Sequence, residues 1–210
     1  MFKITFQEKI LELLQPKPLI SLFALVALAV ILLLISRKNT FNTRILSYAA
    51  MSMSVAFVLS YVKILQFPNG GSITAASMLP LFIFAYIAGP KAGMAAGLCY
   101  GMLQFIQEPF FVHPAQFLLD YPIAFSLLGL AGLFRTNLFA GAVVGAFGRL
   151  LIHFLSGVLF FGEYAQGQNV FIYSLVYNSS YILPDMLICL GVLAISGIRS
   201  AILRLRDARI

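Results

Sequence analysis

Two ionisable side chains, Arg149 and His153, lie in the middle of an apolar stretch over residues 138–161 that reads LFAGAVVGAFGRLLIHFLSGVLFF. On a helix, residues four apart share one face. The residues at this spacing are Gly141, Gly145, Arg149, His153 and Gly157. An ionisable group at the middle of a membrane costs a few kcal/mol or more, so this face must point into protein, and its glycines allow a helix or a flat ligand to approach closely. The pattern favours a binding site inside a helical bundle over a polar pair that only ties helices together.

Further polar side chains fall within, or at the outer ends of, other apolar segments, and they are Asp120, Asn178 and Asp185. At a rise of 1.5 Å per residue, Asp120, His153 and Asn178 are expected in one layer near the outer face. Aromatic residues crowd the same layer: Phe110, Phe111, Tyr121, Phe160, Phe161, Tyr164, Tyr173, Tyr177 and Tyr181. A carboxylate, hydrogen-bonding groups and aromatic faces together suit a flat, polar, cationic small molecule.

Other interpretations of these residues stay open. Asp120 and Arg149 could neutralise each other across two helices, because buried charges are normally paired. Aromatic residues also anchor proteins at membrane interfaces, and Pro184 beside Asp185 could simply bend a helix. An integral-membrane enzyme using Asp120 and His153 as acid and base is an alternative function, and an assembly protein without a ligand is another.

Catalytic motifs are not found in the sequence. HExxH, GxSxG and the phosphate-binding loop GxxxxGK[ST] do not occur, so we expect no enzyme activity and no ATP hydrolysis by that loop chemistry. Cys99 and Cys189 both fall in apolar runs, and we interpret them as buried thiols. We therefore expect no metal site and no resident cofactor.

The composition predicts an integral membrane protein. The 210 residues are 61% hydrophobic and only 10% charged, with a mean hydropathy of +0.96, whereas soluble domains carry about 25% charged residues. The apolar runs are far longer than the roughly 10-residue alternating segments of a membrane barrel, so they predict helices. We expect one helical bundle in the lipid bilayer, without a separate soluble domain.

The net charge of +7 follows the membrane pattern. If the chain weaves back and forth from Arg44 onward, most basic residues fall on one side: Arg37, Lys38, Arg44, Lys91, Arg135, Arg199, Arg204, Arg206 and Arg209. By the positive-inside rule this side, with the C-terminus, is cytoplasmic. No interleaved aromatic and basic motif supports nucleic-acid binding.

The segments divide the chain into two parts. Residues 1–43 combine an amphipathic stretch over 2–14 with an apolar run over 19–36, which predicts an interfacial helix and one extra membrane anchor. Residues 44–210 contain six further apolar segments, about 45–64, 75–88, 92–106, 115–134, 138–161 and 170–195. The third carries Gly93, Gly97 and Gly101 at four-residue spacing, which predicts a close-packing face.

Four stretches carry a family resemblance: FPNGGSI with SMLPLFIFAYIAGPKAGMAAGLCYG, HPAQFLLDYPIAFSLLGLAG, GRLLIHFLSGVLFFGEYA and VFIYSLVYNSSYILPD. In these stretches the chain resembles the thiamine-specific substrate-binding (S) components of energy-coupling factor (ECF) transporters, the ThiT/YuaJ family, over about residues 44–200. The resemblance implies an all-α, six-helix membrane bundle, here with one extra N-terminal helix, in a bacterial plasma membrane. It also implies high-affinity thiamine capture near the outer face and work with a transmembrane coupling subunit and two ATPase subunits. A sister S component for another vitamin, such as riboflavin, is the nearest alternative.

Carried over by position, the resemblance implies a thiamine site made of Asp120, Tyr121, Arg149, His153, Gly157, Phe161, Tyr173 and Asn178. It also implies a small-residue contact with the coupling subunit at Ala49, Ser52 and Ala56. Two departures stand out. Asp120 replaces a glutamate that is one methylene longer, and Gly70-Gly71 lie near the place where some members have a tryptophan over the ligand.

Overall fold

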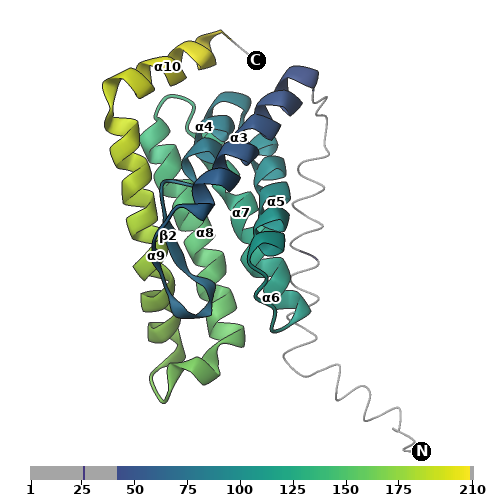
Figure 1. The fold of residues 1–210 in the computed structure, drawn as a ribbon, viewed down its shortest axis with the longest axis vertical. Helices are drawn as coiled ribbons and strands as arrows, with labels where there is room; N and C mark the ends of the chain where they lie inside the picture. Colours follow the sequence, from purple (N-terminus) through teal and green to yellow (C-terminus); the bar gives the residue numbers. More distant parts are fainter. Residues whose placement is uncertain (1–25, 27–41, 209–210) are drawn as a thin grey trace, which may run out of the picture.

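Six helical segments lie side by side in the computed structural model, which describes residue 26 and residues 42–208 (Figure 1). They are α3 (Thr43–Tyr61), α4 (Leu79–Ala88), α5 (Pro90–Gln107), an irregular fourth segment (Pro114–Leu133), α8 (Leu138–Phe160) and α9 (Val170–Ala194). A last helix, α10 (Ser196–Asp207), follows α9. The predicted interfacial helix and extra anchor within residues 1–43 fall almost wholly outside the described residues. The six-helix bundle predicted for the remainder is confirmed.

The bundle presents the outward surface of a membrane protein. Four segments are long and apolar enough to cross a bilayer: α3, the fourth segment, α8 and α9. The exposed side chains of α8 are large and apolar, and include Phe147, Leu151, Leu155 and Leu159. Such a face is stable in lipid and unfavourable in water. The chain is a multi-pass membrane protein.

The fourth segment changes helical period along its length. It begins as α6 (Pro114–Leu118), continues as the π-helical η2 (Leu119–Ile123), and ends as α7 (Ala124–Ser126) and the 3₁₀-helical η3 (Leu127–Leu133). Pro122 lies inside the π turn, where it cannot donate a backbone hydrogen bond. π turns are rare and frequently occur at functional sites, and this one contains Asp120 and Tyr121.

The glycines of α5 allow this segment to approach. A Cβ atom on Gly97 would lie 2.2 Å from the carbonyl oxygen of Phe125, and one on Gly101 would lie 2.3 Å from that of Tyr121. Distances this short are excluded sterically, so only glycine fits at both positions. The predicted close-packing face is confirmed, and it fixes the depth at which Tyr121 and its neighbours lie.

The loop between α3 and α4 forms a β-hairpin. Strands β1 (Lys63–Gln66) and β2 (Ser72–Thr74) pair antiparallel, with Gln66 opposite Ser72. The short helix η1 (Pro68–Gly70) makes the turn, with φ +64° at Asn69 and +92° at Gly70. Because β1 begins at Lys63, α3 ends at Tyr61 and not near residue 64.

A buried turn between β2 and α4 delays the start of that helix to Leu79, four residues later than predicted. Thr74 Oγ1 accepts from the Ser77 N–H at 3.2 Å and lies within hydrogen-bonding distance of Ser77 Oγ, at 2.7 Å. Asp185 Oδ1, on α9, accepts from the Thr74 amide at 3.2 Å and from its hydroxyl at 2.9 Å. Non-helical backbone is tolerated at membrane depth when protein groups satisfy it in this way.

The two ends of the bundle differ. Figure 1 shows α10 lying across one end, whereas the turn between α8 and α9 lies at the other. Arg206 holds α10 in place by donating to Tyr86 Oη at 2.7 Å and to the carbonyl of Arg135 at 3.2 Å. Away from α10, Lys63 of β1 forms an ion pair with Glu108 at the end of α5.

The three small residues of α3 that were predicted to meet a coupling subunit are buried or half-buried. Ala56 is fully buried in the main core, and the Tyr100 hydroxyl donates to its carbonyl oxygen at 3.1 Å. Ala49 and Ser52 are half-buried. The exposed small residues of this helix are Ser47, Ala50 and Ser54. The side predicted to meet a coupling subunit therefore packs largely within the bundle at Ala56.

Candidate functional site

A single pocket contains every residue predicted from sequence for the ligand site. It lies towards the end of the bundle away from α10, between the hairpin, α5, the fourth segment, α8 and α9. Its lining includes Asp120, Tyr121, Arg149, His153, Gly157, Phe161, Tyr173 and Asn178. These residues come from the fourth segment, from α8 and its C-terminal end, and from α9, so three segments converge on one space, as the layer argument expected.

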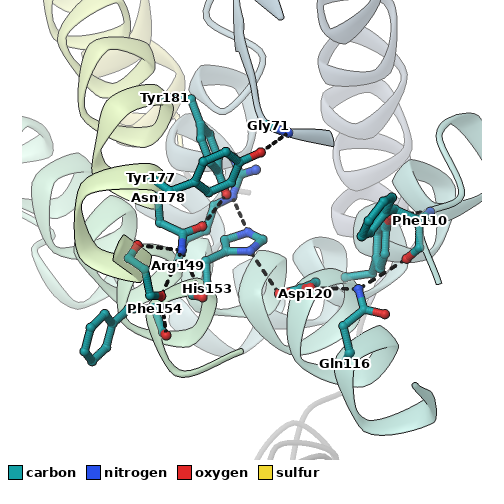
Figure 2. Close-up of polar contacts among 12 residues, drawn as sticks. Gly71, Phe110, Gln116, Asp120, Arg149, His153, Phe154, Tyr177, Asn178 and Tyr181 are labelled. Carbon is teal, nitrogen blue, oxygen red and sulfur yellow. Dashed lines mark hydrogen bonds and ion pairs between the residues drawn. The ribbon is translucent and has the colours of Figure 1, made fainter. Parts of the chain in front are cut away.

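A chain of polar contacts crosses the pocket wall (Figure 2). Gln116 Nε2 donates to Asp120 Oδ2 at 2.7 Å, and Asp120 Oδ1 lies 3.2 Å from His153 Nδ1. Arg149 Nε donates to His153 Nε2 at 3.3 Å. Because Nε2 accepts from the guanidinium, the imidazole proton belongs on Nδ1, where it donates to the carboxylate. The arrangement leaves oxygen lone pairs of the Asp120 side chain free beside the pocket.

Arg149 does not neutralise Asp120 by direct contact. Among residues 42–208, no ion pair joins these two side chains. The Arg149 guanidinium instead lies 4.2 Å from the centroid of the Phe125 ring, a cation–π contact. The imidazole of His153 stands between the two charges, so the carboxylate keeps acceptor capacity for a ligand.

Aromatic rings form two stacked pairs around the pocket. Phe161 stacks on Phe110 with centroids 5.8 Å apart and planes at 19°. Tyr173 stacks on Tyr177 with centroids 6.0 Å apart and planes at 17°. Tyr121 has a different role. Its hydroxyl accepts from Phe110 N–H and donates to the Glu108 carbonyl, both at 2.9 Å. It fixes the loop that carries Phe110.

Asn178 lines the pocket, but its amide is engaged within the protein. Its Nδ2 donates to the carbonyls of Ser174 at 2.9 Å and His153 at 3.2 Å, and its Oδ1 accepts from Tyr181 Oη at 2.7 Å. The side chain is 4% exposed. Asn178 therefore ties α9 to the backbone of His153 and orients Tyr181. Gly157 makes this contact possible, because a Cβ there would lie 2.1 Å from Ser174 Oγ.

The hairpin covers one side of the pocket. The Tyr177 hydroxyl accepts from Gly71 N–H at 3.2 Å (Figure 2). It also donates to the carbonyl of Pro68. A Cβ atom on Gly71 would lie 2.7 Å from the ring of Tyr181. A glycine is thus required where the hairpin meets the two tyrosines. Gly70-Gly71 lie near the place where the resemblance puts a tryptophan in some members. In this chain the backbone at Gly71 instead packs closely against the two tyrosines.

Gln116 and Glu108 line the pocket but were not predicted, and Tyr177 and Tyr181 were expected in the aromatic layer without being named as ligand-binding residues. The four-residue step from Gln116 to Asp120 was a usable signal, because residues at that spacing meet on a helix. Asn69-Gly70 between KILQ and SIT was an equally usable hairpin signal.

Glu108, which lines the pocket, forms an ion pair with Lys63 of β1. Lys63 is largely covered and Glu108 is more exposed, with side-chain exposures of 19% and 40%. Burial lowers the pKa of the Lys63 ammonium below its ordinary value. Within the described residues, no group of three or more His, Cys, Asp or Glu side chains could hold a metal ion.

Comparison with known proteins gives a consistent result. The family model described as "Thiamine transporter protein (Thia_YuaJ)" matches residues 46–204. The thiamine transporter ThiT of Bacillus subtilis is 36% identical over 172 residues, which cover 72% of this chain and 88% of that protein. ThiT of Lacticaseibacillus paracasei is 29% identical over 171 residues, covering 70% and 83%.

A solved structure agrees with this. ThiT from Listeria monocytogenes superposes with a TM-score of 0.65 at 28% identity, covering 72% of this chain and 94% of that one. The relatives are named as transporters, which are not enzymes, and this confirms the expectation that the chain is not an enzyme. A family model that spans most of the chain, a relative above 30% identity and a shared fold lead to one conclusion: the chain belongs to the thiamine transporter (Thia_YuaJ) family.

Proposed function

We propose that this chain captures thiamine at the outer face of a bacterial plasma membrane and serves as the substrate-binding subunit of an ECF-type, ATP-driven vitamin importer. Family membership supports thiamine as the ligand. The observation that carries the proposal is the Asp120–His153–Arg149 chain set between two stacked aromatic pairs.

The pocket chemistry matches the two halves of thiamine. Its aminopyrimidine offers an exocyclic amine, which can donate a charge-assisted hydrogen bond to the free acceptor positions of Asp120. Its thiazolium ring is a flat cation, and the faces of Phe161 and Tyr173 attract such a ring. In this arrangement Arg149 and His153 position the Asp120 carboxylate, and Asn178 joins α9 to α8. Gly157 leaves the space for α9 to pack against α8, and Tyr121 holds the loop that carries Phe110.

Charge placement supports the orientation. The end covered by α10 carries Arg135, Arg199, Arg204 and Arg206, so by the positive-inside rule it faces the cytoplasm together with the C-terminus. The pocket then opens outward, where external thiamine is available. Residues 1–43 would add an interfacial helix and one anchor to this unit.

In this proposal the energy for transport comes from other subunits. The sequence has no GxxxxGK[ST] loop, so partners would hydrolyse the ATP. We place the coupling subunit against α3, whose exposed face carries Ser47, Ala50 and Ser54, because small residues permit close helix contact. Two ATPase subunits would complete the importer.

Calorimetric titration of the detergent-purified chain tests the ligand. Tight binding of thiamine by the chain alone, without ATPase activity, is the expected result. Riboflavin and other vitamins serve as competitors. Tighter binding of one of them than of thiamine would identify that vitamin as the ligand and refute the assignment of thiamine. Uptake into proteoliposomes tests coupling, since transport should require the coupling subunit, both ATPases and ATP. Thiamine uptake by this chain alone would refute the ECF part.

A further inference from the structure

A second cavity lies at the opposite end of the molecule from the thiamine pocket. It occupies about 460 Å³ beneath α10, between that helix and the ends of α4, α8 and α9. Its apolar lining includes Leu138 and Leu193 of the bundle and Ile202 and Leu203 of α10. Its polar lining comes from Arg199, Thr136 and Asn137. None of these residues belongs to the site described above.

The charge around this cavity is positive and incompletely paired. Within residues 42–208, the acidic side chain at this end is Asp207, and it pairs with Arg206 at 2.8 Å. Arg199 has no carboxylate partner within the described chain, and its guanidinium lies 5.9 Å from the ring centroid of Phe139. The Asn137 oxygen caps α8 by accepting from Ala140 N–H at 3.1 Å, so its NH₂ group is left as a donor. The cavity thus offers cationic and neutral donors beside an apolar lining.

We propose that this cavity binds one anionic phospholipid from the leaflet at the α10 end. A phosphodiester accepts the paired hydrogen bonds that a guanidinium donates, and Arg199 supplies them. Leu138 and Leu203 provide the surface for the start of an acyl chain. The location agrees, because the cavity lies where the spans α8 and α9 meet the interface, and basic pockets between transmembrane helices at such depths bind anionic headgroups.

Native mass spectrometry of the full chain tests the proposal, using phosphatidylglycerol and phosphatidylcholine with identical acyl chains. The unaltered protein should retain phosphatidylglycerol preferentially. Arg199→Gln should lose about fivefold in retention, the effect of one basic residue near an anionic lipid. Arg204→Gln is the matched control, since Arg204 is exposed on the same helix and does not line the cavity. It should retain the lipid as the unaltered chain does.

Three outcomes would overturn the proposal. Equal losses in the two arginine variants would indicate general attraction to the basic surface, and equal retention of both lipids would remove the charge requirement. Glycerol phosphate binding as well as the lipid would show a site for free anions. Circular dichroism checks that each variant is folded.

A second measurement does not depend on Arg199. The chain has no tryptophan, so Leu203→Trp creates a single reporter inside the cavity. Brominated phosphatidylglycerol should quench its fluorescence more than brominated phosphatidylcholine at equal fractions. Equal quenching by both lipids would contradict the assigned occupant.

Discussion

Replacing Asp120 by asparagine isolates the charge of the pocket carboxylate while leaving its shape unchanged. In the structure Asp120 accepts from Gln116 Nε2 at 2.7 Å and faces His153 Nδ1 at 3.2 Å. An amide has one oxygen, so its NH₂ group must face one of these two donors. The variant therefore loses a charge-assisted hydrogen bond within the wall and the one offered to the ligand.

The expected magnitude follows from that loss. A hydrogen bond to a charged group contributes about 1.5–3 kcal/mol, so the dissociation constant for thiamine should rise about 10- to 150-fold. Calorimetric titration in detergent measures it. Asp120→Glu, which keeps the charge but shifts it by one methylene, should lose less affinity than Asp120→Asn.

Asp185→Asn is the matched control, because it makes the same chemical change in the same bundle. Asp185 does not line the pocket, and one oxygen accepts both of its hydrogen bonds from Thr74. An asparagine oxygen can accept the same two bonds, so affinity should stay unchanged. Unaltered affinity in Asp120→Asn, or an equal loss in Asp185→Asn, would refute the reasoning.

Three further predictions concern the contacts around the pocket. Gly157→Ala places a methyl group 2.1 Å from Ser174 Oγ and should lower the free energy of unfolding by about 1–3 kcal/mol. A thermal melt measures this change. An unchanged melting temperature would contradict the close packing of α8 against α9. Tyr177→Phe removes the hydroxyl that bonds the hairpin backbone, so thiamine should dissociate faster in stopped-flow measurements, whereas an unchanged rate would show that this bond does not hold the ligand. Lys63→Gln breaks the pair with Glu108 and should cost about 1 kcal/mol or less, as partly exposed pairs do; a larger loss in denaturant titration would show a stronger role.

The glycine and polar stripes were readable from sequence because a helix repeats its faces regularly. Gly97 and Gly101 pack against the fourth segment, and Arg149 and His153 face the pocket, as their four-residue spacing predicted. The apolar run lengths gave the six segments for the same reason. Regular periodicity thus predicts most of the helices of the bundle and many of the residues that line the pocket.

Features that depend on long-range partners were not readable in this way. The turn before α4 is stabilised by Asp185, which accepts hydrogen bonds from the amide and hydroxyl of Thr74. The sequence around residue 74 gives no indication that this acceptor lies on α9. Asp120 lies in a π turn and contacts His153, 33 residues away on α8, and helical spacing alone does not indicate a contact between these two segments. Asn178 was chosen for its amide, but the contacts that engage this amide come from α8 and from Tyr181.

The bond between Thr74 and Asp185 has a consequence for biosynthesis. The two residues are 111 positions apart, and Asp185 lies on the last membrane span. As the ribosome delivers the chain, the turn after the hairpin emerges long before the group that satisfies its backbone. The pocket, to which the final span contributes Tyr173 and Asn178, can thus be completed only after the translocon has released that span, so we expect a nascent chain truncated before it to be inserted without a complete pocket.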